Sequence, residues 1–212
     1  MPETPTPPPS LSAGAPAAFF DQVARVAGER AGAWEAFTAV LATPDRQTVA
    51  RLRTGELAGA WRAGVRWLGA DTEMFTAALM SLDVHARGAR RRGADADLLA
   101  LEVDHAALVA PHLPVLAHLP DVVALCRDEA AAWSAGDLVL GKDLRARQHA
   151  IVDEALVPTL PNLGEQLAGS AQADIWRVIG RLLLGFVSIE TGRDYQRAVL
   201  GETRARFLDP TP

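Results

Sequence analysis

Cysteine is nearly absent from this sequence. Among 212 residues the only cysteine is Cys126. A single cysteine cannot form a disulfide within the chain or build a cluster of thiolate metal ligands, which fits a reducing compartment. Cys126 follows Leu125 in an apolar helical pattern, so we expect its thiol to be buried and unreactive.

The sequence also lacks a surplus of basic residues. It has 21 Lys and Arg against 26 Asp and Glu, which gives a formal net charge of -5. Nucleic-acid-binding proteins usually gather positive charge on one surface. A DNA-binding helix-turn-helix would need a basic recognition helix, and the basic run at 87–92 occurs where we expect a helix to end. Nucleic acid is therefore not an expected partner.

A long hydrophobic run is missing as well. The longest apolar stretch, Val178 to Ile189, is too short to cross a bilayer and contains Arg181. Residues 1–16 are rich in Pro, Thr, Ser and Ala, and they have neither the basic start nor the apolar centre of a signal peptide. We expect residues 1–16 to form a disordered tail, and the protein to be cytoplasmic without membrane insertion.

The patterns that are present are helical. Apolar residues recur at helical spacing from Phe19 to the end, and no segment alternates as a half-buried strand would. Residues 17–212 are therefore predicted to form an all-α multi-helix bundle of about eight or nine helices. The proline-rich segment near 110–120 is predicted to be a loop or a set of short turns, and a hinge between N-terminal and C-terminal sub-bundles.

Several helix ends can be predicted from capping residues. Asp95, Asp121 and Ser170 are expected to be N-caps, because short polar side chains accept hydrogen bonds from the first amides of a helix. Gly136 is expected to end a helix, and so is Gly93 after the basic run 90–92.

Glu102 and His105 form a Glu-x-x-His spacing, which places both side chains on one side of a helix. Di-iron bundle proteins use this spacing twice, together with further glutamates, and the sequence has no second copy. Three interpretations remain: a polar cluster that fixes helix packing, a ligand-binding site, or a metal site. His85, His112, His118 and His149 have no ligand spacing, so no zinc is expected.

Catalytic motifs are absent too. No P-loop, nucleophile elbow or dinucleotide-binding glycine motif is found, so we expect no enzyme activity, no catalytic residue and no cofactor. The five tryptophans are spread over several predicted helices. Trp67 points away from the apolar stripe of its helix, so it either lines a groove for an apolar peptide or packs against a neighbouring helix.

Three segments resemble the TorD/NarJ-like chaperones, which assist the maturation of molybdenum oxidoreductases. Residues 29–52 resemble the opening helix of that family, with its Pro-Asp turn. Residues 98–111 resemble its central segment, which places an acidic residue and a leucine before a proline-rich loop. Residues 148–167 resemble its most specific motif and retain Glu154, Leu156, Pro158, Leu160 and Pro161. His105 replaces an expected aromatic residue, and Ala155 and Thr159 replace a histidine and a tryptophan.

This resemblance implies a cytoplasmic, system-specific chaperone. Such a protein would bind the catalytic subunit of a DMSO-reductase-type molybdoenzyme, through its twin-arginine leader or its mature part, and assist cofactor insertion before export. Acidic side chains near the proline-rich segment would meet the basic residues of the client. The expected partner-binding residues are Glu102, Asp104, His105, Pro111, Pro120 and Asp121.

Two other classes of function remain open. One is a helical adaptor or regulatory protein without a maturation role, and the other is a metal- or cofactor-dependent helical enzyme built on Glu102 and His105. The resemblance also allows either a monomer or a dimer that exchanges helices between its two copies.

Overall fold

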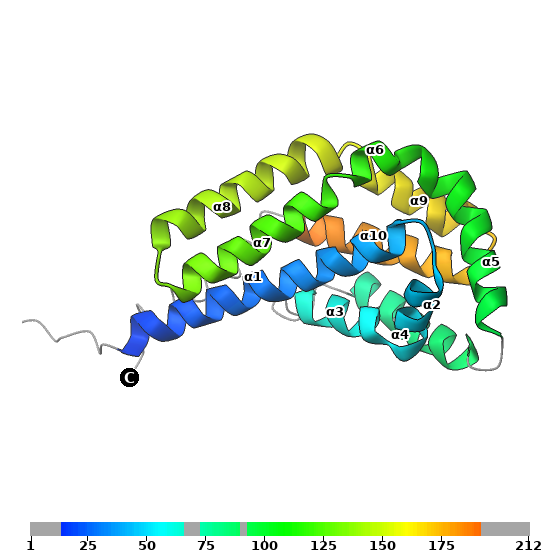
Figure 1. Cartoon of the computed structure of the whole chain (residues 1–212), viewed down its shortest axis with the longest axis horizontal. Coiled ribbons are helices and arrows are strands. Elements are labelled where there is room, and N and C mark those ends of the chain that lie inside the picture. The colour runs from blue at the N-terminus through cyan, green and yellow to red at the C-terminus, as the bar shows by residue number, and fades with distance from the viewer. Residues whose placement is uncertain (1–13, 66–72, 90–92, 192–212) are drawn as a thin grey trace, which may run out of the picture.

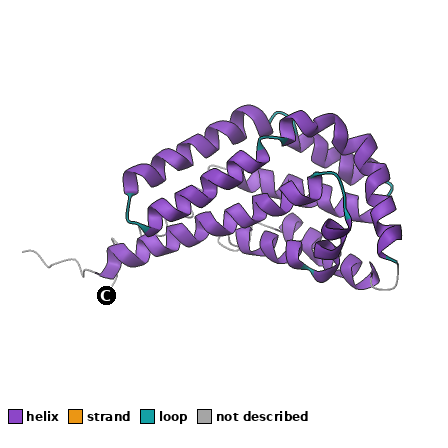
Figure 2. Cartoon of the chain, viewed as in Figure 1, coloured by secondary structure: helices purple, strands orange, loops and turns teal. Residues whose placement is uncertain are grey.

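The computed structural model describes residues 14–65, 73–89 and 93–191. All regular elements in these ranges are helices, and no strand occurs among them (Figure 2). The predicted all-α fold is thereby confirmed. The helix order, with bounds, is α1 Gly14–Leu41, α2 Arg46–Thr54, α3 Glu56–Val65, α4 Glu73–Ala89, α5 Ala94–Asp104, the π-helical turn η2 His105–Val109, the 3-10 turn η3 Ala110–His112, α6 Leu113–Leu116, α7 Leu119–Ser134, α8 Leu138–Ile151, the π-helical turn η4 Val152–Leu156, α9 Leu160–Ser170 and α10 Asp174–Thr191.

The long helix α1 runs through the middle of the molecule and packs against α7 on one side and α3 on another (Figure 1). α7 in turn packs against α8, while α10 packs against both α9 and α4. α5 stands at one end of the bundle, across the direction of the other helices, and the chain then bends toward α6 (Figure 1). One side of this α5–α6 path therefore lies against the bundle and the other faces outward.

The main hydrophobic core contains residues from before and after the segment 110–120. Trp34, Trp61, Trp176, Phe37 and Phe186 are completely buried in it, and their burial stabilises the fold by roughly 1.5–3 kcal/mol or more per side chain. The described helices thus share one main core across the proline-rich segment. A smaller cluster, in which Phe19 and Phe20 pack on Trp133, closes the far end of the α1–α7 pair.

The proline-rich segment folds into short helical turns, which is one of the two forms predicted for it. Pro111, Pro114 and Pro120 each lie in the first turn of a helical element, η3, α6 and α7 respectively. Proline is tolerated there because the amides of a first turn have no partner inside the helix. The segment consequently continues the helical path rather than interrupting it.

The structure confirms one of the predicted helix-ending residues and differs from the others. Gly136 has φ 74° just beyond α7, which confirms the glycine that ends this helix. Gly93 has φ -67° and is the N-cap of α5, so its predicted role as a left-handed C-cap is wrong, and so is Asp95 as N-cap. Residues 90–92 lie outside the described residues. Asp121 is in the first turn of α7, whose N-cap is His118.

Ser170 is the last residue of α9 instead of the N-cap of the following helix, which begins at Asp174. The amides just before α10 obtain their acceptor from a distant side chain, that of Asp104. A carboxylate can replace a local cap in this way because the first amides of a helix can donate to any well-placed oxygen.

Candidate functional site

The six predicted partner-binding residues all lie between α5 and the start of α7, but they divide into a buried and an exposed group. Asp104 and His105 are buried, with 3% and 5% of their surface exposed. Glu102, Pro111, Pro120 and Asp121 are exposed. Only the exposed group can meet a partner without rearrangement of the fold.

Asp104 links α5 to the start of α10. Its two carboxylate oxygens accept hydrogen bonds from the backbone amides of Gln172 (3.0 Å) and Ala173 (2.7 Å). Beside it, the indole of Trp176 donates to the backbone carbonyl of Leu101 at 3.0 Å. The two bonds to the Asp104 carboxylate are charge-assisted, and charge-assisted hydrogen bonds are among the stronger ones in proteins. The contacts of Asp104 therefore serve the packing of α10 against α5.

His105 is also directed into the fold. Its Nε2 lies 3.3 Å from the backbone carbonyl of Leu41, and its ring centroid is 6.3 Å from that of Trp176. Glu102, at the Glu-x-x-His spacing, is exposed instead. The π-helical turn begins at His105, directly after Asp104. These contacts favour the packing interpretation, and no group of three or more metal-ligating side chains is found among the described residues.

The outer side of the α5–α6 path has an apolar surface, which we call the outward face and define as Leu99, Val103, Ala106, Ala107 and Leu113. All five residues are exposed, Leu99 by 62%, Val103 by 49% and Leu113 by 39%. The buried side of the same path contributes Leu101, Val109 and Leu116 to the core. The path is thus apolar on both sides, whereas a surface helix normally has one polar side.

The path from α5 to the start of α7 has acidic side chains but no lysine or arginine of its own, and Arg46 and Arg53 of α2 form ion pairs with its acids Asp95 and Asp97. Between Gly93 and Cys126 the sequence contains no lysine and no arginine. Asp95 and Glu102 are exposed along α5, and Asp121 is exposed at the start of α7. An apolar strip with acidic neighbours complements a partner that is apolar and either neutral or basic.

The same path has the length and composition of a membrane span. Among the described residues, one helix, Ala94–Leu116, passes this test, and only 22% of its apolar window is buried inside the fold. The path also contains two buried polar residues, Asp104 and His105, which have partners inside the bundle.

A second polar feature, which the sequence patterns did not predict, lies inside the bundle. Arg30 of α1 binds Glu190 of α10 through two hydrogen bonds, and its Nη1 reaches Glu129 of α7 (3.3 Å) and Gln148 of α8 (3.1 Å). The exposed fraction of each of these four residues is 5% or less. Four helices therefore meet around one guanidinium group.

Neighbouring side chains complete this buried network. Trp34 donates to Glu190 and Trp133 to Glu129, each at 3.3 Å, and Gln148 donates to Glu129 at 2.8 Å. Burial raises the pKa of Glu129 above its ordinary value, against the opposing effects of Arg30, Gln148 and Trp133. The network is closed to solvent and shows hydrogen bonds among its own members, so its contacts are structural.

Cys126 also belongs to this network. Its thiol is completely buried and donates to Gln148 Oε1 at 3.2 Å. Burial raises the pKa of Cys126 to about 12, so the reactive thiolate is rare at neutral pH. The predicted buried position of this thiol is confirmed.

The tryptophans do not line a groove in the described part of the chain. Trp34, Trp61, Trp133 and Trp176 are all buried, with 3% exposure at most. Trp67, the residue considered for a groove, lies outside the described residues. The exposed apolar surface is therefore aliphatic, and Leu99, Val103 and Leu113 are its largest members on the α5–α6 path.

In comparisons with known proteins, the chain matches no protein-family model, no curated protein and no solved structure.

Proposed function

We propose that this protein is a cytoplasmic chaperone that binds the catalytic subunit of a DMSO-reductase-type molybdoenzyme and assists insertion of the molybdenum cofactor before export. The resemblance of residues 29–52, 98–111 and 148–167 to the TorD/NarJ-like chaperones supports the client class. The protein acts by binding and performs no catalysis. Its client is the unfinished subunit, bound through the leader or through the mature part.

One observation carries the proposal: the outward face is apolar, exposed and flanked by acids. Leu99, Val103 and Leu113 project from a helical path that already contributes its other side to the core. Exposed apolar surface is unfavourable in water unless a partner covers it, and such surfaces are typical of binding sites. An apolar client segment would gain free energy by covering them.

The charge around the face sets the orientation of the client. Glu102 lies beside the apolar strip, and Asp121 lies beyond its C-terminal end. Arginine side chains of a client segment would make charge-assisted hydrogen bonds with these carboxylates. Because both acids are exposed, each pair contributes little by itself and acts mainly on encounter rate and orientation.

The roles of the predicted site residues change accordingly. Glu102 and Asp121 contact the client, with Pro111 and Pro120 on the surface between them. Asp104 and His105 position the path from inside through their contacts with α10 and α1. An alanine substitution at Asp104 would therefore test the fold more than the binding site.

The test is binding of the purified apo-subunit, with and without its leader, to the full-length protein. Val103→Asp is expected to weaken binding by ~10-fold or more, because it places a charge in the apolar contact. The double variant Glu102→Gln with Asp121→Asn is expected to weaken binding less, by roughly 2- to 10-fold, because exposed ion pairs contribute little each. Val139→Asp is the matched control, because Val139 is 80% exposed but lies on α8. Equal binding by all variants would contradict the site.

Affinity capture from the native cytoplasm tests the client itself. Recovery of a molybdoenzyme catalytic subunit that is unprocessed or lacks its cofactor supports the chaperone function. Recovery of a folded partner of another kind, while such a subunit is expressed, would favour the alternative of a helical adaptor or regulatory protein.

A further inference from the structure

We propose that α5 is a strap, which opens and closes over the start of α10, and that its opening divides the outward face and releases a client. The strap is Ala94–Asp104, with Gly93 at one end and the π-helical turn η2 at the other. The opening rests on the contacts of α5 alone. The release of a client also rests on the proposed function.

The strap has little hold on the hydrophobic core. Of its eleven residues only Leu101 and Asp104 are buried, whereas α7 and α10 bury eight and ten of theirs. Leu98 is partly buried and packs against the main core as well. Burial of an apolar side is what holds most helices in place, since short helices are not stable by themselves. A helix with one buried leucine therefore opens more readily than its neighbours.

The strongest contacts of the strap are polar. The Asp104 carboxylate accepts hydrogen bonds from the backbone amides of Gln172 (3.0 Å) and Ala173 (2.7 Å), and Trp176 donates to the carbonyl of Leu101. When the strap opens, water hydrates the carboxylate and the amides that it leaves. The free energy of opening is therefore smaller than the strength of these bonds suggests.

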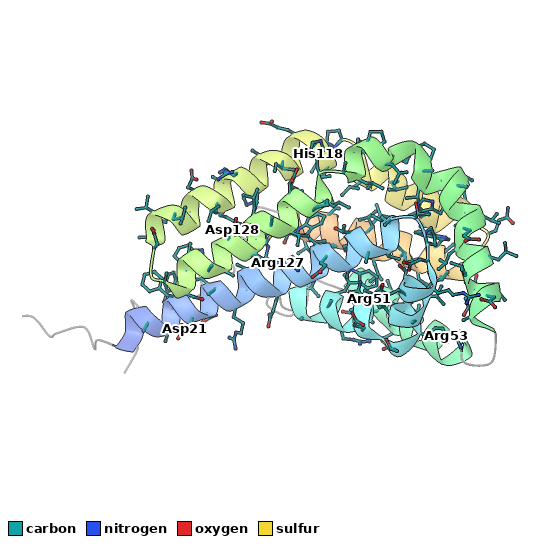
Figure 3. All side chains as sticks on the ribbon, viewed as in Figure 1. Asp21, Arg51, Arg53, His118, Arg127 and Asp128 are labelled. Carbon is teal, nitrogen blue, oxygen red and sulfur yellow. The ribbon has the colours of Figure 1, made fainter. Side chains whose placement is uncertain are left out.

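Two ion pairs with α2 hold the other end of the strap. Arg53 pairs with Asp97 and Arg46 with Asp95, each at 3.0 Å. Figure 3 labels Arg53, which lies at the same end of the bundle as α5. In the Arg46–Asp95 pair both side chains are 79% exposed, and exposed ion pairs contribute little to stability. These pairs orient the closed strap without fixing it strongly.

Both ends of the strap have a backbone that permits a bend. Gly93 precedes the helix in an extended conformation (φ -67°, ψ 146°), and a Cβ atom there would meet no other atom within 4 Å. Glycine has more backbone freedom than any other residue. At the other end the chain enters the π-helical turn at His105, and helices bend sharply at such turns. The strap is thus bounded by two positions where the chain can change direction.

Opening of the strap would divide the outward face. Leu99 and Val103 belong to α5, whereas Leu113 lies beyond the bend, on α6. A client that covers both parts holds the strap closed, and a client on an open strap loses one part of its apolar contact. Closure of the strap and binding of the client therefore favour each other.

Hydrogen exchange of the full-length protein without a client tests the opening. An isolated helix of eleven residues is marginal in water, so the amides of residues 98–104 lose their helical hydrogen bonds when the strap opens. We expect them to exchange roughly 100-fold faster than those of residues 123–134 in α7, because local opening requires less free energy than global unfolding. Low concentrations of urea should hardly change their rate, since little surface is exposed. Exchange as slow as that of α7, or as strongly accelerated by urea, would overturn the proposal.

Three variants separate opening of the strap from general destabilisation. Asp104→Asn should speed the exchange of residues 98–104 by about 10-fold, because it removes one acceptor of the contact with α10. Asp121→Asn is the matched control and should leave this rate unchanged. Gly93→Ala should slow the exchange by about 2- to 5-fold, because alanine reduces the freedom of the open state. Equal rates in Asp104→Asn and its control, or no slowing in Gly93→Ala, would overturn the strap.

The purified apo-subunit tests the release of a client. Its binding should slow the exchange of residues 98–104 by roughly 10-fold or more, because a bound client joins the two parts of the outward face. Unchanged exchange in the saturated complex would overturn the release role. A protein that opens as expected but binds no apo-subunit would contradict the proposed function alone, and a protein that binds it without opening would contradict the strap alone.

Discussion

Arg30 and Glu190 are separated by 160 residues in sequence and form a bidentate ion pair in the centre of the bundle. The Nε–Oε1 and Nη2–Oε2 distances are 2.8 and 2.5 Å, and each side chain is only 2% exposed. The pair joins α1 to α10, and Glu129 and Gln148 bring α7 and α8 to the same guanidinium group. One buried polar centre thus joins α1, α10 and the consecutive pair α7 and α8, which lie far apart in the sequence.

Loss of Glu190 should destabilise the protein strongly. Glu190→Ala leaves Arg30 buried without its bidentate partner, and we expect the free energy of unfolding to fall by about 3–5 kcal/mol. Urea denaturation measures this change. The matched control is Glu35→Ala, which removes an ion pair with Arg127 that is about half exposed and should cost less than about 1 kcal/mol. Similar losses in both variants would contradict the importance of the buried pair.

Glu129 should make the stability of the protein decrease as the pH rises. Burial raises its pKa in the folded state above the ordinary value, so the folded protein binds more protons than the unfolded chain between the two pKa values. Stability contributed by the protonated form is therefore present at low pH and is lost as the pH rises through this window.

The comparison of wild type with Glu129→Gln isolates this effect, since glutamine does not titrate. Denaturation at pH values from 4 to 8 should show the wild type losing stability relative to Glu129→Gln as the pH rises. A wild-type advantage that grows with pH would mean that Arg30 lowers the pKa of Glu129 more than burial raises it.

The sequence predicted the helices well because apolar spacing depends on local geometry. Val23, Val26, Ala33 and Phe37 recur at helical spacing in the sequence, and all four are buried in α1. Arg30 occupies the position between Val26 and Ala33 that continues this apolar stripe. An arginine on an apolar stripe was the available signal for a buried ion pair, but its partners lie in other helices and could not be found from spacing.

The candidate site could be predicted only in part, for a related reason. The spacing of Leu98, Leu101, His105 and Leu108 indicates one apolar side, but it does not show that the opposite side of α5, with Leu99 and Val103, is also apolar. The π-helical turn at His105 also changes the helical phase, which regular spacing cannot show. Asp104 is buried because α10 packs against it, and this contact between residues distant in sequence cannot be predicted from local spacing.

Gly180 should tolerate no side chain, because α9 and α10 are in close contact there. A Cβ atom at this position would lie 2.6 Å from the backbone nitrogen of Ala168 and 2.6 Å from the carbonyl oxygen of Gly164. Backbone atoms cannot move aside as a flexible side chain can, so Gly180→Ala should cost about 1–3 kcal/mol or more. The control is Gly59→Ala, in the interior of α3 with open space around it, which should stabilise by up to about 1 kcal/mol. Thermal denaturation distinguishes the two, and a tolerated Gly180→Ala would contradict the close packing.

Cys126 should resist alkylation in the folded protein. With its pKa at about 12, roughly one thiol in ten thousand is ionised at pH 8, whereas an ordinary exposed thiol is ionised by about a tenth or more. Iodoacetamide labelling followed by intact mass spectrometry should show modification only at the rate of unfolding. Addition of urea above the midpoint should make the reaction fast, and rapid labelling without urea would show that the thiol is accessible.

Asp104 and Asp121 should separate stability from binding, since one carboxylate is buried and the other is exposed. Asp104→Asn replaces one acceptor oxygen by an NH2 group, which then faces the amide of Gln172 or Ala173, so we expect a loss of about 1–3 kcal/mol in unfolding free energy. Asp121→Asn should change the unfolding free energy by less than about 0.5 kcal/mol, because substitutions at exposed surface positions usually have effects of this size. The effects on binding of the apo-subunit should be the opposite, when measured at temperatures where both variants are folded. Asp121→Asn should weaken binding, whereas Asp104→Asn should retain the wild-type affinity. If Asp104→Asn weakened binding while its unfolding free energy stayed at the wild-type value, Asp104 would contact the client directly, and its assignment to the packing of α10 would be wrong.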